Sequence, residues 1–282
     1  MAGDLGLFAT QIRYLTLREL ANIGYGHFGG SLSIVEALAA LYGGELTFDP
    51  KNPDWPGRDY FVLSKGHAGP ALYAALAASG FFGVERLWTL NANGTRLPSH
   101  PDRQKVEGVE MTTGSMGQGI SVAAGIAYGL CAQGRPNRVY TLVGDGELNE
   151  GQCWEAAQFI AARKLTNLVV LVDHNKRQLD GWASEIGGES DFVAKFAAFG
   201  FAARSVDGQD AAAIGQALAD ARLETGKPVC IVLDTTKGAG VSYVSDALDN
   251  HHMRLNDAGR SAVDAAIEQL GAALAREGIS YE

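Results

Sequence analysis

The sequence predicts an α/β fold in which a doubly wound parallel sheet is flanked by helices. Three features of the 282-residue chain support this class: short apolar runs recur in its second half, helical patterns separate them, and glycine-flanked polar turns follow them. Strands with continuous apolar sequence are typical of parallel sheets that are buried on both faces. The length allows one large domain. We therefore expect a single domain over 1–282, with residues 257–282 forming a C-terminal helical tail.

The first half of the chain is expected to be mainly helical. Apolar residues with helical spacing predict helices over 10–23, 31–43, 69–80 and 120–132. Ser31 or Ser33 is expected to cap the second of these helices. The apolar run from Tyr60 to Leu63 predicts a buried strand, which leads into a loop at Ser64–His67.

The second half alternates strands with helices. Strands are expected within 138–146, 167–175, 201–208 and 228–238, and helices within 149–164, 191–200, 211–226 and 257–277. In an open parallel sheet, ligands bind beyond the carboxyl ends of the strands. Three of these strand ends carry polar, glycine-flanked sequences, namely "VGDGELNEG", "LVDHNKRQLDG" and "DTTKGAG". We therefore expect the functional site at this edge.

The composition argues against several classes of partner and location. The formal net charge is -9, which disfavours nucleic acid or an anionic membrane as the main partner, since both attract basic surfaces. The three cysteines are far apart and form no CxxC motif, so neither a disulfide framework nor a zinc site is expected, and a reducing, cytoplasmic location fits. The N-terminal segment lacks the pattern of a signal peptide, and no window predicts a membrane span.

Two polar residues at neighbouring strand ends predict a metal site. Asp145 follows an apolar strand between two glycines, and Asn175 ends the next strand thirty residues later. One helix and one strand fill that interval, so both side chains should emerge at the same sheet edge. A carboxylate and an amide oxygen suit Mg²⁺, which completes its octahedron with phosphate oxygens and water. The helix that begins near Asn149 would direct its N-terminus toward those phosphates.

The stretch "GYGHFGG" contains the glycine spacing of a dinucleotide-binding loop, Gly24-x-Gly26-x-x-Gly29. That interpretation would make the protein a dehydrogenase, but it requires a strand before the glycines. The preceding segment, "QIRYLTLRELANI", has a helical pattern instead. We therefore expect the glycines to let the loop approach a ligand closely, and His27 to face that ligand.

Several motifs together resemble the N-terminal half of transketolase. Besides "GDG" and the asparagine at the next strand end, the matching segments follow the family's order: "NIGYGHFGGSLSIVEAL" (22–38), "LSKGHAGPALYAAL" (63–76), "LPSHPD" (97–102) and "VEMTTGSMGQGISVAAGIA" (109–127). The resemblance covers about residues 10–255. It implies a thiamin diphosphate-binding fold, and it implies the cofactors thiamine diphosphate and Mg²⁺, for which Ca²⁺ or Mn²⁺ could substitute.

The resemblance also implies roles for individual residues. The metal ligands would be Asp145, Asn175 and the backbone carbonyl of Arg177. The cofactor would contact His67, Gly114, Ser115, Met116, Gly146, Asn175 and His251. Three histidines would serve catalysis by binding the donor sugar, namely His27, His100 and His251. Two acidic residues match positions near the interface between the two cofactor-binding domains, namely Glu150 and Glu155.

This chain departs from the family pattern at two places. Many members have Pro-Leu where this chain has Ser115 and Met116, and the family has His-Gly where His252 follows His251. The first departure concerns the segment expected against the cofactor, and the second weakens the match at His251.

Four further polar residues lie near the predicted site but are assigned no definite role in it. Asp173 and His174, which precede Asn175, are expected to be loop residues. Lys65 and Lys237 lie in glycine-rich stretches, where they could attract phosphate or be solvated.

One half of the family's site has no counterpart in this sequence. In transketolases, the glutamate that activates the aminopyrimidine lies in a pyrimidine-binding domain, and the main arginines that bind sugar phosphate also lie outside the N-terminal half. The resemblance therefore implies a split enzyme in which this chain is the N-terminal subunit. A C-terminal transketolase subunit would supply the missing domain in an α2β2 assembly. The implied activity transfers a two-carbon ketol unit from a ketose or ketose phosphate donor to an aldose or aldose phosphate acceptor.

Other functions stay open from the sequence. The chain could belong to another split thiamine-dependent enzyme, such as a 2-oxo acid dehydrogenase alpha subunit or a deoxyxylulose-phosphate synthase-like protein. It could also be a non-catalytic subunit that retains the fold. The histidines at 27, 67 and 100 favour transketolase, and the intact pair of Asp145 and Asn175 argues against a non-catalytic role. The sequence does not identify the sugar.

Overall fold

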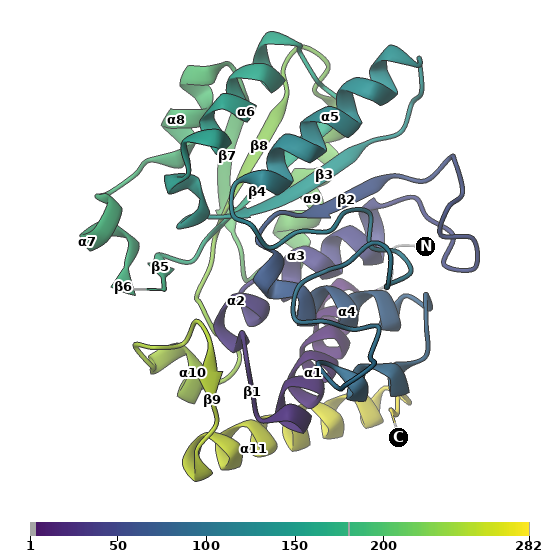
Figure 1. Ribbon diagram of the computed structural model, residues 1–282, viewed down its shortest axis with the longest axis vertical. Helices are drawn as coiled ribbons and strands as arrows, with labels where there is room; N and C mark the ends of the chain where they lie inside the picture. The colour runs from purple at the N-terminus through teal and green to yellow at the C-terminus, as the bar shows by residue number, and fades with distance from the viewer. Residues whose placement is uncertain (1–3, 180, 282) are drawn as a thin grey trace.

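A five-stranded parallel sheet lies at the centre of the structure (Figure 1). The computed structural model describes residues 4–179 and 181–281. In spatial order the strands are β2 (Tyr60–Leu63), β3 (Val139–Gly144), β4 (Leu168–His174), β8 (Val229–Asp234) and β7 (Ala202–Asp207). Every neighbouring pair is parallel, and each strand falls within a predicted range. The predicted α/β fold with a parallel sheet flanked by helices is confirmed.

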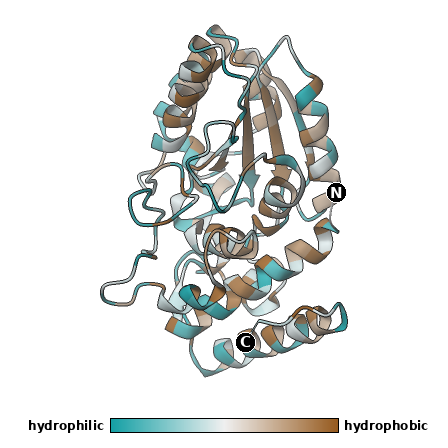
Figure 2. Ribbon diagram, turned by 90° about the vertical axis from the view of Figure 1, so that its right-hand side faces the viewer, coloured by the Kyte–Doolittle hydropathy of each residue, from teal (hydrophilic) through white to brown (hydrophobic). Residues whose placement is uncertain are grey.

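Helices cover both faces of this sheet because alternate strand residues point to opposite sides. On one side, Val169 and Leu171 of β4 join a buried cluster with the helices α1 (Leu5–Ile23), α3 (Val35–Ala40), α4 (Gly69–Ala78) and α9 (Ala211–Leu223). On the other side, Val170 and Val172 pack with α5 (Gln118–Ala132), α6 (Gly151–Ala162) and α8 (Phe192–Phe199). Figure 2 shows the brown apolar strands enclosed between helices. The last helix, α11 (Asp257–Arg276), packs along α1.

The predicted helix over 31–43 is broken in the structure. It is replaced by α2 (Phe28–Leu32), α3 and a π-helical turn, η1 (Leu41–Glu45). The prediction that Ser31 or Ser33 caps this helix is wrong, since His27 precedes α2 and Ile34 precedes α3. The physical reason is a tertiary contact: Ser33 turns its hydroxyl to the buried carboxylate of Asp173, at 2.7 Å.

Two short antiparallel ribbons, which the sequence patterns do not predict, bring distant loops together. β1 (Tyr25–Gly26) pairs with β9 (Met253–Arg254), so the loop after α1 lies beside the loop before α11. β5 (Arg177–Gln178) pairs with β6 (Gly181–Trp182) directly after β4. The remaining short helices are η2 (Gly66–Ala68), η3 (Val84–Thr89), η4 (Glu147–Asn149), α7 (Ala183–Gly187) and α10 (Ser242–Asp246). Within the described ranges, no helix combines the length and the apolar sequence needed to cross a membrane.

Candidate active site

The carboxyl ends of four parallel strands meet at one edge of the sheet, and polar residues follow each of them. The loops after β2, β3, β4 and β8 carry, in that order, His67, Asp145, Asn175 and Lys237. The β1–β9 ribbon adds His27 and His251 to the same place, because their rings lie 5.5 and 4.7 Å from that of His67. Residues more than 200 positions apart in the sequence therefore share one site.

Asp145 and Asn175 lie side by side, as the sequence predicts. Both are nearly buried, at 3% and 7% exposure. Asp145 accepts hydrogen bonds from the backbone N–H groups of Gly146 and Lys176, so the residue after Asn175 directly contacts its carboxylate. The amide of Asn175 donates to Asp173 at 2.7 Å, and its oxygen accepts from the N–H of Arg177 at 3.1 Å. These hydrogen bonds hold the carboxylate of Asp145 and the amide oxygen of Asn175 at the ends of β3 and β4.

The carboxylate of Asp145 forms no ion pair with any residue that the structure describes. Burial raises its pKa to about 7, with the nearby charge of Asp173 adding to the shift. A divalent cation beside Asp145 would stabilise the buried negative charge of its carboxylate. Carboxylate, amide and backbone carbonyl oxygens are the hard ligands that Mg²⁺ takes. The described residues contain no cluster of three or more acidic, histidine or cysteine side chains suited to a metal. Such an ion would therefore depend on Asp145, on amide and carbonyl oxygens and on ligands from a bound phosphate.

Five of the six histidines gather beside this pair. The ring of His27 is central: its centroid lies 5.5 Å from those of His67 and His100, 5.3 Å from that of His251 and 4.8 Å from that of His252. His252 belongs to the cluster although the sequence assigned it no role. Its position after His251 was the available signal.

Four of the clustered histidines favour the neutral form, namely His27, His67, His100 and His251. Burial, followed by the charge of His251, lowers the pKa of His27 to about 3. Burial, followed by Lys237, lowers the pKa of His251 to about 4. The pKa values of His67 and His100 are also lowered, chiefly by burial. At neutral pH these rings can therefore donate and accept hydrogen bonds to hydroxyl groups without adding positive charge.

The segment from Gly114 to Met116 borders the histidines. Gly114 has a φ of 142°, and a Cβ there would lie 2.9 Å from the His100 ring, so only glycine fits. Ser115 is exposed, and Met116 is 47% exposed although it is apolar. The loop therefore exposes the side chains of Ser115 and Met116 at the edge of the site. Gly114, which has no Cβ, lets the backbone of the loop pack against the ring of His100.

A buried ion pair, which the sequence interpretation missed, supports the sheet edge that carries Asp145 and Asn175. Asp173 is the penultimate residue of β4 and is fully buried, so its assignment to a loop is wrong. It forms a salt bridge with Lys65, which is 1% exposed, and accepts hydrogen bonds from Ser33, Asn175 and Thr235. Burial raises the pKa of Asp173, but the charge of Lys65 and these donors outweigh it and leave that pKa below its ordinary value.

The solvated interpretation of Lys65 and Lys237 is wrong, since they are 1% and 4% exposed. His174 is likewise not in a loop. It ends β4, and its ring packs 5.2 Å from that of Phe192, away from the other histidines. Acidic and basic residues flanked by apolar strand sequence, as in "VVLVD" and "VLSKG", were the signal that could have revealed the pair of Lys65 and Asp173.

Glu147 is another residue that the sequence interpretation missed, and it links three segments around the site. It is 2% exposed and accepts from the hydroxyl of Ser64 at 2.6 Å, from the N–H of Gly117 at 2.8 Å and from the N–H of Gly144 at 3.1 Å. These donors belong to the β2 loop, the segment after Met116 and the end of β3. The carboxylate therefore locks the predicted cofactor loop to the sheet.

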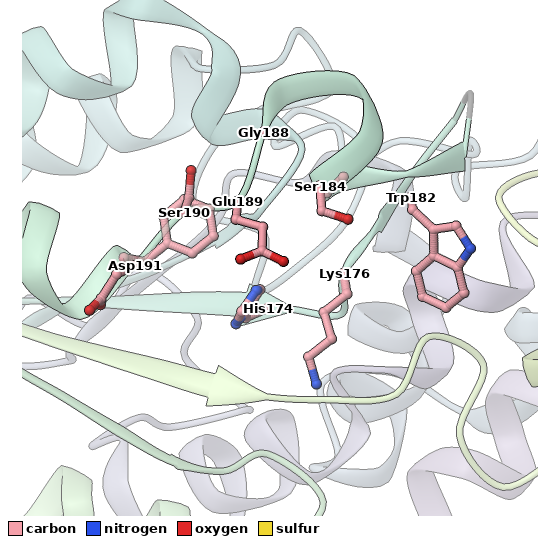
Figure 3. A pocket seen from close by; sticks show the side chains of 10 residues that line it. His174, Lys176, Trp182, Ser184, Gly188, Glu189, Ser190 and Asp191 are labelled. Atoms are coloured by element: carbon pink, nitrogen blue, oxygen red, sulfur yellow. The ribbon is translucent and has the colours of Figure 1, made fainter.

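A separate cavity of about 510 Å³ opens beside the end of β4 (Figure 3). Its lining includes His174, Lys176, Trp182, Glu189 and Asp191. None of the residues predicted to bind cofactor, metal or substrate lines it. The predicted site residues therefore lie in the histidine cluster and at the edge with Asp145, outside the lining of this cavity.

Comparisons with known proteins agree with this geometry. Residues 6–275 match the family model described as transketolase, thiamine diphosphate binding domain. The chain is 48% identical over 269 residues to the 6-deoxy-6-sulfo-D-fructose transketolase subunit SqwG of a Clostridium species, covering 95% of this chain and 98% of that protein. It is 39% identical to one subunit of the apulose-4-phosphate transketolase of Actinobacillus succinogenes, covering 80% and 82% of the two chains. A crystal structure of transketolase from Campylobacter jejuni superposes with a TM-score of 0.87 at 30% identity, covering 96% of this chain but 43% of that one.

Proposed function

The chain belongs to the transketolase family, and we propose that it is the N-terminal, diphosphate-anchoring subunit of a two-subunit transketolase. The observation that carries the proposal is the combination of the Asp145–Asn175 edge with the neutral histidine cluster. The relatives support the same assignment, since the chain covers 98% of a protein that is named as a transketolase subunit and 43% of the solved Campylobacter jejuni transketolase chain. We treat residues 1–282 as one domain, with 257–282 as its helical tail.

In this proposal, Mg²⁺ is held by Asp145, Asn175 and the carbonyl of Arg177, and Ca²⁺ or Mn²⁺ could take its place. Thiamine diphosphate, when bound, supplies the nucleophilic carbon that ketol transfer needs. The residues that would hold it are His67, Gly114, Ser115, Met116, Gly146, Asn175 and His251. The closeness of Gly146 to Asp145, where its N–H donates at 2.8 Å, supports a site in which backbone and metal face the same phosphates.

The histidines would bind the donor sugar and hold protons at their ring nitrogens. His27, His100 and His251 lie around one ring and favour the neutral form, so each would accept a hydrogen bond from a hydroxyl at one ring nitrogen and donate one to a sugar oxygen from the other. This is what ketol transfer requires of the chain itself.

A partner subunit would supply the pyrimidine-binding domain, its activating glutamate and further sugar-binding groups. The exposure of Glu150 and Glu155 at the start of α6 supports a contact surface there. We propose an α2β2 assembly in the cytoplasm, and the free thiols of Cys131, Cys153 and Cys230 fit a reducing compartment. Neither nucleic acid nor a membrane is needed.

The substrates would be sugars with a terminal anion. The two relatives quoted above are named for 6-deoxy-6-sulfo-D-fructose and for apulose 4-phosphate. Since the first is 48% identical, a sulfonated ketose is the first donor to try, and ketose phosphates are the second.

The test is a donor screen on the complex of this chain with its partner subunit, in the presence of thiamine diphosphate and Mg²⁺. Sulfofructose, ketose phosphates and pyruvate are offered with an aldose acceptor, and the product sugars are followed by mass spectrometry. Transfer of two carbons from a ketose supports the proposal. Turnover of pyruvate alone would favour a 2-oxo acid enzyme, and no turnover of any donor, with the cofactor bound, would favour a non-catalytic subunit.

A further inference from the structure

One face of the β1–β9 ribbon is buried, and the other carries polar side chains. Gly26 pairs with Met253 on the buried face, where a Cβ at Gly26 would lie 2.6 Å from a methyl carbon of Leu20. Tyr25 pairs with Arg254 on the opposite face, since neighbouring residues of a strand point to opposite sides. Tyr25 is partly buried and Arg254 is exposed. This pair lies at the end of the ribbon that leads into α11, and the other pair lies at the end that leads into α2 (Figure 1).

The polar face of the ribbon continues the histidine cluster. The ring of His252 lies 4.8 Å from that of His27 and 6.0 Å from that of Tyr25. The guanidinium carbon of Arg254 lies 5.2 Å from the centre of the Tyr25 ring. The four side chains therefore form a row in the order His27, His252, Tyr25 and Arg254, which we call the ribbon row. One end of the row is a histidine proposed to bind the donor sugar, and the other end is an exposed cation.

The guanidinium of Arg254 forms no ion pair with any acidic side chain in the described part of the chain. It lies over the ring of Tyr25 instead. Such a contact attracts the cation to the ring but supplies no oxygen acceptor for its five N–H donors. Arg177, which also lies beside the site, donates to a backbone carbonyl. Within the described residues, Arg254 is therefore a cation whose charge is available to a ligand.

His252 connects the cluster to the rest of the ribbon row. Its side chain is exposed, and its ring approaches the rings of both His27 and Tyr25. A glycine at this position, which is the usual residue of the family, would remove the side chain that approaches both. Imidazole and phenol groups each donate and accept hydrogen bonds. The row therefore offers groups that suit hydroxyls before it ends in a guanidinium.

A sugar with a terminal phosphate or sulfonate presents its groups in the same order. Its hydroxyls suit the imidazole and phenol groups of the row. Its terminal oxyanion suits arginine, whose planar donors bind two oxygens of such a group at once. In the proposed function, His27 binds hydroxyls of the donor sugar. A sugar chain that extends from His27 along the ribbon row would therefore bring its charged end to Arg254.

We propose that His252, Tyr25 and Arg254 form the subsite for the end of the sugar that is farthest from its carbonyl, with the guanidinium of Arg254 bound to the terminal phosphate or sulfonate. This inference rests on the proposed function. This subunit would then select a charged sugar through its own residues, in addition to any groups that the partner subunit supplies. Because the contact lies away from the reacting carbon, it should act on KM rather than on kcat.

The test compares donors that differ at this end of the sugar, namely 6-deoxy-6-sulfofructose, fructose 6-phosphate and fructose. The complex of this chain with its partner subunit, loaded with thiamine diphosphate and Mg²⁺, is assayed with each donor and with glyceraldehyde, an acceptor without an anion. Arg254→Met keeps the unbranched stem and removes the charge, Arg254→Lys keeps the charge, and His252→Gly introduces the family residue. Arg276→Met, at an exposed arginine in the last turn of α11, is the matched control. Gel filtration checks that each variant forms the complex.

We expect Arg254→Met to raise KM for the two charged ketoses by about tenfold, as for the loss of hydrogen bonds between charged groups. Its kcat should change by less than about threefold, and its KM for fructose by less than about twofold. Arg254→Lys should recover part of the affinity for the charged ketoses. His252→Gly should raise KM for all three ketoses by about twofold to tenfold, because it removes a hydrogen bond to a hydroxyl. A larger loss with sulfofructose than with fructose 6-phosphate identifies a sulfonate as the preferred anion, and the reverse identifies a phosphate.

Failure of this inference differs from failure of the proposed function. If Arg254→Met raises KM for charged and neutral ketoses equally, or leaves every KM within about twofold of the wild type, Arg254 does not bind the anion and the inference is wrong. It is also wrong if Arg276→Met has the same effect as Arg254→Met, or if Arg254→Met no longer forms the complex, since Arg254 would then serve assembly. In each of these cases the proposed function stands. If the wild-type complex binds the cofactor but transfers two carbons from no ketose, the proposed function fails and the inference fails with it.

Discussion

Replacing Lys65 with methionine tests the packing that supports the site. The ammonium of Lys65 and the carboxylate of Asp173 form a salt bridge whose side chains are 1% and 0% exposed. Methionine keeps the unbranched stem but removes the charge, so the carboxylate of Asp173 would be buried without its cation. Breaking a buried pair from one side costs about 3–5 kcal/mol.

The structure places the expected cost at the lower end of that range. Asp173 keeps its donors from Ser33, Asn175 and Thr235 after the change, and these hydrogen bonds still stabilise the carboxylate. We therefore expect Lys65→Met to lower the free energy of unfolding by about 3 kcal/mol. A domain with a stability of about 5–15 kcal/mol would still be folded at 25 °C.

Urea unfolding of the full chain, followed by circular dichroism, measures this cost. Asp173→Asn and the double variant complete a double-mutant cycle, in which the double variant should lose at least about 1 kcal/mol less than the sum of the two single losses. The reasoning is refuted if Lys65→Met costs under about 1 kcal/mol, or if the two changes are strictly additive, because either result would mean that the pair is solvated or uncoupled.

Three further changes test other parts of the site and the core. Asp145→Asn should weaken Mg²⁺ binding at least about tenfold, as calorimetry would measure. In the wild type, the affinity for Mg²⁺ should fall as the pH drops below about 7, where the buried carboxyl takes up a proton. An Asp145→Asn variant that binds Mg²⁺ as tightly as the wild type would remove Asp145 from the site. Glu19 is fully buried, neither carboxyl oxygen has a hydrogen-bond partner among the described residues, and burial raises its pKa, so the folded chain keeps a proton that the unfolded chain releases. The contribution of Glu19 to the free energy of unfolding should therefore be greatest below its ordinary pKa of about 4.5 and decline as the pH rises above it. Glu19→Gln should remove that part of the decline in thermal unfolding scans between about pH 5 and about 8, and an unchanged slope would show that Glu19 is solvated. His27→Ala should lower kcat/KM by about a hundredfold with the affinity for thiamine diphosphate within about threefold, whereas an equal loss of cofactor affinity would assign His27 to the cofactor instead of the sugar.

The central sheet could be predicted because its signal is local. Each strand is a continuous apolar run, and successive residues of β4 belong alternately to the two buried clusters. A short window of sequence is therefore enough to predict each strand. The pairing of β1 with β9 could not be predicted in this way. It joins Tyr25 to Arg254 through two residues on each strand, and no local pattern records a contact over such a separation.

The candidate site also has a part that local sequence predicts and a part that depends on contacts between distant segments. Asp145 and Asn175 follow recognisable strands, so their meeting at one edge could be predicted from topology. The break in the predicted helix over 31–43 and the burial of Lys65 have one cause, the fully buried Asp173. Several segments contribute donors to that carboxylate, and only the folded chain brings them together.

The most direct test of the central claim is a reconstitution titration. A fixed amount of this chain, with thiamine diphosphate and Mg²⁺ in excess, is mixed with increasing amounts of the separately purified partner subunit, while the rate of ketol transfer is recorded. The account predicts no measurable transfer by either chain alone and a rate that saturates when the two chains are equimolar. Sustained transfer by this chain without its partner would contradict it, since the chain would then supply both halves of the cofactor site.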